Sequence, residues 1–325
     1  MRINTINITD CDMDEERYRD CADLEAMIRG IGFDGIEFMH IEGGNEAFFD
    51  PSLILGVHLR YFNEWVDLWR GDLDGLKKEY DSLETAKKIF GSLDPSGMMA
   101  MFREDLERAK RLDARYVVFH VSNIKIPEYF SGRCAYRDEE VVDAAAELIN
   151  ELLDGYEYEF EFLLENLWWP GLTMTRPEIT GRLLDQIHYP KTGIMLDTGH
   201  LLHTNLELQT QEEGIAYIKE MIRNHGDLAK RIRGIHLNQS LTGAYVKELY
   251  AKHLAMPETY EERISLCYQH VFQIDRHEPF TTRAVRELFE VIDPAYVTFE
   301  LISVSREAHE RALKLQWEAL YGEEA

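Results

Sequence analysis

Short apolar runs recur along the chain, and polar or helix-favouring residues separate them. Most of these runs are rich in Val, Ile, Phe and Leu at successive positions, which is typical of strands that are buried on both faces of a parallel sheet. We therefore predict eight strands: Ile3–Ile8, Gly35–Met39, Ile54–Leu59, Tyr116–Val121, Phe160–Leu167, Gly193–Leu196, Ile232–Leu237 and Tyr296–Leu301.

Between these runs, apolar residues return at the spacing of amphipathic helices. Cys21, Leu24 and Ile28 share this spacing, and Pro177 stands where the first residue of a helix is expected. The predicted helices are Glu15–Arg29, Met98–Leu112, Glu139–Leu153, Pro177–Ile187, Glu212–Asn224, Thr282–Val291 and Arg306–Tyr321.

The alternation of strands and helices predicts a parallel α/β architecture. Eight units favour a closed (β/α)8 TIM barrel over an open sheet, as a single domain spanning residues 1–325. Two connections are predicted as long loops, at about 61–96 and 239–273. Their aromatic side chains either offer a surface to a ring or sugar, or pack the loops against the barrel. These side chains are Trp65, Trp69, Tyr245, Tyr250 and Tyr260.

The chain is strongly acidic, with 60 Asp and Glu against 35 Lys and Arg and a formal net charge of −25. This charge opposes binding to nucleic acids, whose affinity depends on basic contacts to phosphate. The cysteines form no Cys-x-x-Cys pair, so we expect free thiols, with a Cys11–Cys21 disulfide as the alternative. No apolar run approaches membrane-spanning length, which indicates a soluble cytoplasmic protein without a membrane partner.

Acids and imidazoles follow the predicted strands at the point where each one ends. In a closed parallel barrel these ends meet on one face, where active sites form. A single such residue more often pairs with Arg or caps a helix, but several that converge repel or stay poorly paired without a cation. We therefore predict that divalent cations are bound there. The candidate metal ligands are His58, His120, Glu165, Asp197, His200, His236, Asp275, His277 and Glu300.

Other motifs are missing. No Gly-x-Gly-x-x-Gly follows the first strand, and the chain has neither a Walker-type phosphate loop nor a Gly-x-Ser-x-Gly elbow. These absences weaken dinucleotide, nucleoside-triphosphate and serine-hydrolase interpretations. The other histidines, among them His40 and His203, are assigned no chemistry.

The strand-end motifs resemble those of the xylose isomerase-like TIM barrel superfamily, which includes AP endonuclease family 2. The resemblance covers nearly the whole chain in order, and the closest motif match is endonuclease IV. Asp275-Arg276-His277 is the most discriminating match, because simple sugar isomerases of the superfamily often lack this triplet. The other matching segments are His58, His120, Leu164-Glu165-Asn166, Leu196-Asp197-Thr198-Gly199-His200, His236-Leu237-Asn238 and Glu300.

The resemblance implies three zinc ions and a division of the ligands among them. The first ion would be held by His58, His120 and Glu165, the second by Glu165, Asp197, His236 and Glu300, and the third by His200, Asp275 and His277. Clustered ions of this kind generate hydroxide at neutral pH and stabilise an in-line displacement at phosphorus. The resemblance therefore implies hydrolysis of a phosphate ester, in DNA or in a smaller molecule.

The chain also departs from endonuclease IV. Glu278-Pro279-Phe280 replaces small residues after the Asp-Arg-His triplet, the loops after His58 and His236 are longer, and no Arg occurs in Glu37–Gly44. Tyr61 nevertheless falls where that family places a DNA-contacting Tyr. Together with the net charge, these departures disfavour duplex DNA as the substrate.

Two other functions stay open. In a sugar or sugar phosphate isomerase or epimerase, one Mn²⁺, Mg²⁺ or Co²⁺ ion would be bound by Glu165, Asp197, His236 and Glu300. Glu165 and Glu300 would then act as the catalytic acid and base. The second alternative is a non-enzymatic, metal-dependent binding protein on the same scaffold. We favour the phosphoesterase, because a one-metal isomerase leaves His58, His120, Asp275 and His277 without a purpose.

Overall fold

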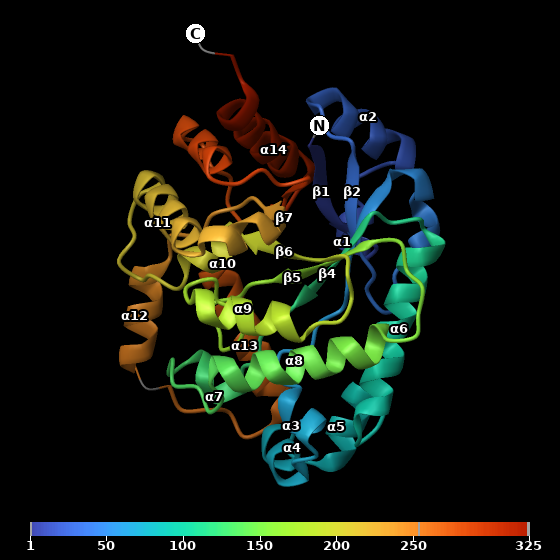
Figure 1. The fold of residues 1–325 in the computed structure, drawn as a ribbon, viewed down its shortest axis with the longest axis vertical. Coiled ribbons are helices and arrows are strands. Elements are labelled where there is room, and N and C mark those ends of the chain that lie inside the picture. The colour runs from blue at the N-terminus through green and yellow to red at the C-terminus, as the bar shows by residue number, and fades with distance from the viewer. Residues whose placement is uncertain (1, 253, 324–325) are drawn as a thin grey trace.

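The computed structural model describes residues 2–252 and 254–323. Eight parallel strands pair in sequence order, and β8 pairs with β1 to close the barrel. Figure 1 shows these strands at the centre of the molecule with helices around them. The predicted (β/α)8 TIM barrel is therefore confirmed, and the observed strands lie within two residues of the predicted bounds. They are β1 (Ile3–Thr9), β2 (Gly35–Met39), β3 (Ile54–His58), β4 (Tyr116–His120), β5 (Glu161–Glu165), β6 (Thr192–Asp197), β7 (Ile232–His236) and β8 (Tyr296–Phe299).

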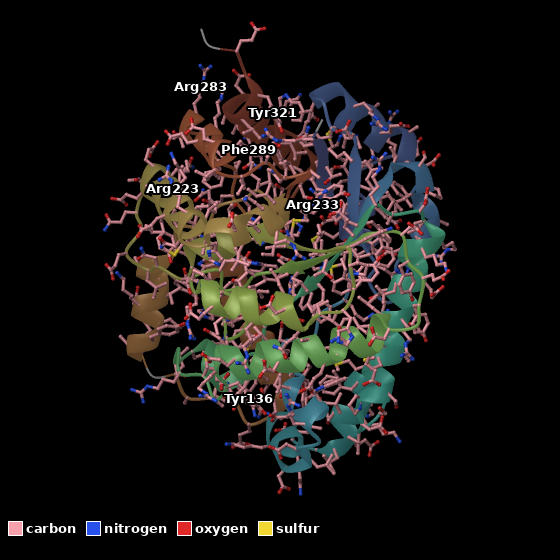
Figure 2. All side chains as sticks on the ribbon, viewed as in Figure 1. Tyr136, Arg223, Arg233, Arg283, Phe289 and Tyr321 are labelled. Carbon is pink, nitrogen blue, oxygen red and sulfur yellow. The ribbon has the colours of Figure 1, made fainter. Side chains whose placement is uncertain are left out.

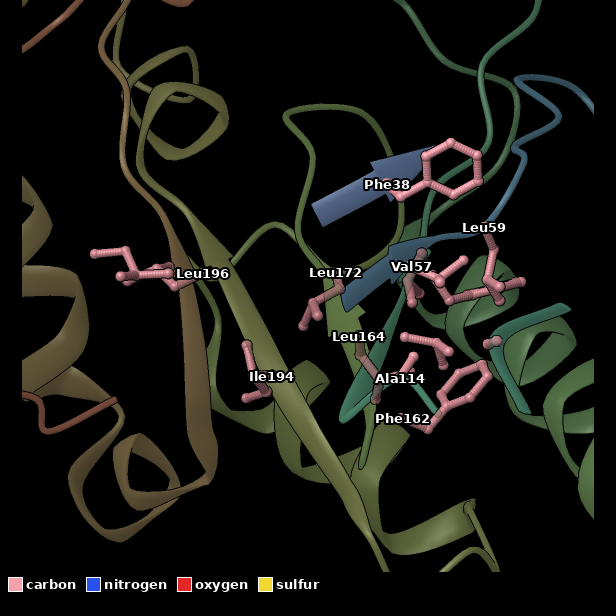
Figure 3. Close-up of a cluster of buried hydrophobic side chains, with 14 of the residues drawn as sticks. Phe38, Val57, Leu59, Ala114, Phe162, Leu164, Leu172, Ile194 and Leu196 are labelled. Atoms are coloured by element: carbon pink, nitrogen blue, oxygen red, sulfur yellow. The ribbon is translucent and has the colours of Figure 1, made fainter. Parts of the chain in front are cut away.

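Each strand is buried on both faces, because alternate side chains point toward the helices and toward the barrel axis. Phe162 and Leu164 of β5 belong to the large core beneath the helices, where Figure 3 shows them with Ile194 of β6. Leu163 between them packs inside the barrel with Met195. This alternation decides which strand residues reach the barrel interior.

The inner core also contains a large aromatic ring that needs a glycine opposite it. Tyr116 of β4 is fully buried inside the barrel. A Cβ atom added at Gly56 of β3 would lie 2.2 Å from the Tyr116 ring carbon Cζ. Gly56 therefore makes room for this ring.

The helices surround the strands largely as predicted, with two differences. The first long helix begins at Cys21, because the Asp20 side chain accepts from the backbone N–H of Asp23 and caps it. The segment predicted as a helix over Thr282–Val291 forms a 3₁₀ helix, in which the buried Val285 and Leu288, three residues apart, share one face. The α-helices are α1 (Asp12–Glu15), α2 (Cys21–Ile31), α3 (Val66–Arg70), α4 (Leu73–Glu79), α5 (Leu83–Phe90), α6 (Pro95–Arg111), α7 (Ile126–Tyr129), α8 (Asp138–Leu153), α9 (Pro177–Gln186), α10 (Thr198–Leu202), α11 (Gln211–Asn224), α12 (Gly243–Lys252), α13 (Tyr260–Ile274) and α14 (Arg306–Tyr321), and the 3₁₀ helices are η1 (Glu46–Phe48), η2 (Pro51–Leu53), η3 (Gly226–Arg231) and η4 (Arg283–Glu290).

Both long connections are present, but they are not irregular loops. The first carries α3, α4 and α5, which Figure 1 places together at one end of the molecule, and the second carries α12 and α13. The two ends of the second connection lie side by side, because Gln239 and Glu278 exchange two backbone N–H to carbonyl hydrogen bonds of 2.9 Å. The residues between them thus form an excursion with joined ends.

The two ends of the described chain lie at the same end of the molecule. Figure 2 labels Phe289 and Tyr321 in this region. The Tyr321 hydroxyl donates to Asn4 Oδ1 of β1 at 2.6 Å, and the Arg2 guanidinium lies 4.5 Å from the centre of the Phe289 ring. These contacts hold α14 and η4 against the first strand and complete the outer ring of helices.

Two other expectations from the sequence concern disulfide bonds and membrane-spanning helices. All four cysteines are free thiols, so no Cys11–Cys21 disulfide forms. None of the helices in the described part of the chain has the length and apolar character required to cross a membrane.

Candidate metal centre

The predicted ligands at the strand ends lie on the inward-facing positions of the barrel. His58, His120, Glu165, Asp197 and His236 are the last residues of β3 to β7, and each lies an even number of residues from an inward-facing position of its strand. Glu300 follows β8 directly and continues the inward alternation of Tyr296 and Thr298. The register of the strands therefore directs all six side chains to the carboxyl end of the barrel.

The structure brings all nine predicted ligands together in three groups. Within each group, one nitrogen or carboxylate oxygen per residue lies within 4.8 Å of the others. Glu165 belongs to the first two groups and joins them, and its Oε1 lies 3.4 Å from Nδ1 of His200 in the third group. The groups are His58, His120 and Glu165; Glu165, Asp197, His236 and Glu300; and His200, Asp275 and His277.

Three imidazoles of the centre are anchored in the same way. Nδ1 of His58 lies 2.8 Å from the carbonyl oxygen of Leu59, and Nδ1 of His200 lies 2.8 Å from that of Asn166. Nδ1 of His277 lies 3.1 Å from the carbonyl oxygen of Glu300. A carbonyl oxygen only accepts, so each Nδ1 donates its proton and Nε2 faces the centre. The main chain thus sets the orientation and the tautomer of these rings.

Each of these Nε2 atoms faces a carboxylate oxygen. The distance is 3.1 Å from His58 to Glu165, 3.2 Å from His200 to Asp275 and 2.8 Å from His277 to Asp275. A neutral ring with its proton on Nδ1 presents a lone pair to this negative oxygen, which is repulsive. The arrangement therefore requires a positive charge at each of these contacts, as a proton or a bound cation.

The second group contains a carboxylate oxygen with no hydrogen bond. Oε2 of Glu300 is buried, and it lies 2.9 Å from Nδ1 of His236 without hydrogen-bond geometry. Buried carboxylate oxygens without partners are costly unless a cation is bound. The donor set of imidazole and carboxylate groups also suits borderline divalent ions. The second group therefore fits a metal ion.

The Asp197-Thr-Gly-His200 turn is fixed by two asparagines. Asn166 exchanges hydrogen bonds with the backbone of Asp197, and Asn238 Nδ2 donates to Asp197 Oδ2 at 2.7 Å. A Cβ atom at Gly199 would lie 1.9 Å from Asn238 Oδ1, so only glycine fits there. This packing holds Asp197 and His200 where two of the donor groups adjoin.

The third group includes a residue with unusual backbone geometry. His277 has a φ angle of +47°, in the left-handed region that non-glycine residues rarely adopt. The Ser240 hydroxyl accepts from the backbone N–H of His277 at 3.2 Å and also lies 3.4 Å from Asp275 Oδ1. Strain of this kind persists where the surroundings enforce it, which is typical of functional sites.

Sequence reasoning missed one buried acid beneath the centre. Oε1 of Glu37, on β2, lies 2.9 Å from Nε2 of His236, and Oε2 accepts from the hydroxyls of Tyr116 and Thr298 at 2.9 Å each. Glu37 thereby orients His236 so that Nδ1 faces Glu165 and Glu300. The signal in the sequence was a glutamate at an inward-facing position of a strand that is otherwise apolar.

The charged groups of the centre shift one another's pKa values. Against the effect of burial, His120 and His236 hold the pKa of Glu165 well below its usual range. Against burial, Asp275 and Glu300 raise the pKa of His277 to about 9. Burial raises the pKa of Asp197 to about 7. The centre therefore stabilises positive charge beside its carboxylates.

A cavity of about 210 Å³ opens above the three groups, and the aromatic residues of the two long connections that were named from the sequence do not form it. None of the five loop aromatics named from the sequence lines this cavity. Trp65, for example, is buried and donates to the carbonyl oxygen of Ser122 at 2.8 Å, so it packs its loop onto the barrel. The cavity is lined instead by Tyr61, Tyr129, Trp168, Trp169, Tyr268 and Phe272.

Two of these aromatic rings contact histidines of the centre. Tyr61 stacks on His120, with ring centres 4.8 Å apart, and Trp168 lies 5.2 Å from the ring centre of His200. Trp168 also contacts His203, whose Nε2 lies 3.4 Å from Asp275 Oδ1. His203, which was assigned no chemistry, therefore contacts a predicted ligand, whereas His40 contacts Asp10.

Comparison with known proteins agrees with this architecture. The family model described as xylose isomerase-like TIM barrel matches residues 26–316. No curated protein sequence matches the chain. Similar solved structures include a putative xylose isomerase from Rhodospirillum rubrum, with 12% identity, a TM-score of 0.54 and 100% of both chains covered. Endonuclease IV from Thermus thermophilus has 14% identity and a TM-score of 0.50, with 97% of this chain and 98% of that chain covered. The IolI protein with a zinc atom has 13% identity and a TM-score of 0.50, with 98% and 96% covered. At these identities the likeness concerns the fold.

Proposed function

Because the chain belongs to the xylose isomerase-like TIM barrel family, we propose that it is a divalent-metal-dependent phosphoesterase with a multinuclear centre. The fold alone does not select this reaction, since one barrel supports many chemistries. The proposal therefore depends on the three donor groups at the carboxyl ends of the strands.

One observation carries the proposal, namely the orientation of the imidazoles. His58, His200 and His277 each donate Nδ1–H to a main-chain carbonyl and turn Nε2 toward a carboxylate. In proteins, this is the way a histidine is prepared to ligate a metal ion. This orientation occurs in the first and third groups, so histidines oriented as metal ligands are found outside the group around His236 as well.

The three groups would hold three ions. Glu165 offers Oε2 to His58 and His120 on one side, and Oε1 to His236 on the other, so it is placed to bridge two of them. The mixture of imidazole and carboxylate donors suits Zn²⁺ first, and it also accepts Mn²⁺, Mg²⁺ or Co²⁺.

When bound, such ions supply a hydroxide nucleophile at neutral pH and stabilise negative charge on the oxygens at phosphorus. The protein residues hold the centre for this chemistry. Glu37 fixes His236 from below, and Asn166 and Asn238 fix Asp197. Tyr61 and Trp168 cover the sides of the cavity and limit the access of bulk water to the imidazoles.

The alternative is a sugar isomerase or epimerase. Glu165 and Glu300 both lie beside Nδ1 of His236, at 3.1 and 2.9 Å, as a one-ion site with two carboxylates would require. In that enzyme they would exchange a proton with the substrate. The alternative assigns no role to the Asp275 and His277 pair, so the phosphoesterase accounts for more of the structure.

Metal analysis with activity assays tests the proposal. We expect three equivalents of a divalent ion per chain and hydrolysis of bis(p-nitrophenyl) phosphate. We expect His277→Ala to lose about one equivalent and at least 100-fold in activity, because this residue belongs to the third group only. His188→Ala, which removes an exposed imidazole, is the matched control and should retain both. A single equivalent, with ketose epimerisation that survives His277→Ala, would favour the isomerase instead.

A further inference from the structure

The cavity above the metal centre has an apolar side. Helix α13 contributes Ile264, Tyr268, Val271 and Phe272 to its lining, and Met39 and Ile302 line it from the segments at the ends of β2 and β8. The acids and imidazoles lie at the base of the same cavity. A molecule in this cavity would therefore contact the donor groups at one end and apolar side chains at the other.

Several of these apolar side chains are exposed to solvent. The exposed fraction is 58% for Phe272, 46% for Tyr268 and 47% for Ile302. Large apolar side chains that gather at the mouth of a cavity mark a surface that binds a ligand. Because they adjoin the donor groups, we identify the occupant of this surface with the substrate of the centre.

Helix α13 is held in place over the cavity. Arg263 at its first turn lies 2.7 Å from Asp81, and Tyr260 packs against Tyr80 with ring centres 5.1 Å apart. Cys267 of α13 is buried in one cluster with Ile126 and Tyr129 of α7. The apolar wall is therefore preformed, which reduces the ordering cost when a ligand binds.

The charges around the cavity argue against a polynucleotide. No Lys or Arg of residues 2–252 and 254–323 lines it. The Arg60 guanidinium donates two hydrogen bonds to Asp105, and Arg276 lies 3.7 Å from Glu278. A nucleic acid would need several basic contacts to its phosphates. An anionic group would fit in the cavity at one place, over the cations that the donor groups are proposed to bind.

We propose that the substrate is a small phosphate ester that carries one apolar, ring-sized group. The phosphate would lie over the donor groups, and the apolar group would pack against Tyr268 and Phe272 of α13 and against Ile302. This inference rests on the proposed phosphoesterase function and adds the class of its substrate.

Binding of two phosphonates to the full chain, loaded with the ion that metal analysis identifies, tests the inference. Phenylphosphonate and methylphosphonate carry the same anionic group and differ in the apolar group. Burial of a phenyl ring predicts at least about 10-fold tighter binding of phenylphosphonate by calorimetry. We expect Phe272→Ala to reduce this preference by about 3- to 10-fold without changing the affinity for methylphosphonate. Tyr156→Ala, which truncates an exposed aromatic residue outside the cavity, is the matched control and should keep the preference.

The outcomes separate the two proposals. Equal affinity for the two phosphonates would overturn the substrate class, whatever the esterase activity. Faster hydrolysis of an abasic-site duplex than of methyl p-nitrophenyl phosphate, which carries one ring, would also overturn the substrate class, while the esterase function would stand. A clear phenyl preference without hydrolysis of any ester would overturn the phosphoesterase function and leave the apolar recognition in place.

Discussion

Replacement of Glu37 by Gln tests whether a residue that is not itself a predicted ligand sets the metal affinity of the centre. Three donors converge on this carboxylate, namely Nε2 of His236 and the hydroxyls of Tyr116 and Thr298, at 2.9 Å each. Glutamine has nearly the same shape, and its amide oxygen can still accept from His236 while the two hydroxyls accept from its NH₂ group. The fold should therefore survive, but the negative charge behind His236 is lost.

The size of the effect follows from that loss. Without the negative charge behind it, Nδ1 of the His236 ring is a weaker metal ligand, and the tautomer that carries its proton on Nε2 is less strongly enforced. Loss of such a partner typically lowers metal affinity by roughly 10- to 100-fold, or about 1.4–2.8 kcal/mol. Because His236 is the only predicted ligand to which Glu37 hydrogen-bonds, and His236 belongs to one donor group, the affinity for one ion should fall and the affinity for the other two should not.

Competition with a chelator measures this change directly. Apo protein titrated with Zn²⁺ in the presence of a chromogenic chelator should show one weakened site in Glu37→Gln and unchanged sites in Glu161→Gln. Glu161 is the matched control, because it also lies on the barrel wall but accepts from Arg233 and Tyr296. If Glu37→Gln binds all its ions as tightly as the wild-type protein, Glu37 does not position His236 and our account of the network beneath the centre is wrong.

Three further predictions concern stability. Burial, and after it the negative charges of Asp67 and Glu79, raises the pKa of Glu64 to about 8. The folded state therefore keeps a proton that the unfolded state loses near pH 4.5, and the free energy of unfolding should fall as the pH rises between these two values. Glu64→Gln should remove this pH dependence and stabilise the protein at pH 9 by on the order of 3 kcal/mol, as measured by chemical denaturation. If the free energy of unfolding changes equally with pH in both proteins, the prediction is wrong. Gly56→Ala should cost about 1–3 kcal/mol or more, because its Cβ would overlap the Tyr116 ring, and an unchanged melting temperature would refute the tight packing. Removal of bound ions with a chelator should lower the melting temperature reversibly, since ions that bind only the folded state stabilise it, and a melting temperature that does not respond to chelator or to added Zn²⁺ would count against the metal centre.

The sequence predicted the strands well for a physical reason. A strand buried on both faces must be apolar at nearly every position, so β4 and β5 were recognisable without any neighbour. The strand ends then placed six of the nine candidate ligands, because inward alternation is regular along each strand. The sequence did not show α4 and α5, because short helices in a long connection depend on tertiary contacts more than on local periodicity.

The parts of the site that were missed depend on three-dimensional contacts. Glu37 reads as one polar residue in an apolar strand, and only the closed barrel brings it 2.9 Å from His236. The sequence left open whether Trp65 and the other loop aromatics bind a ligand or pack the loops, and it did not single out Tyr268 and Phe272, which α13 turns toward the cavity. Which side of a loop helix faces a cavity is decided by its anchors, here Arg263 and Tyr260, and these contacts cannot be read from composition.

The joined ends of the excursion between Gln239 and Glu278 have an evolutionary consequence. Asp275, His277 and the apolar residues of α13 all lie inside that excursion, whereas eight strands and seven of the nine candidate ligands lie outside it. A deletion or exchange between the two paired residues would remove a donor group and a recognition wall in one event, yet leave the barrel and the group around His236 intact. In evolution, a change in this one segment would therefore alter the third donor group and the apolar wall of the cavity together.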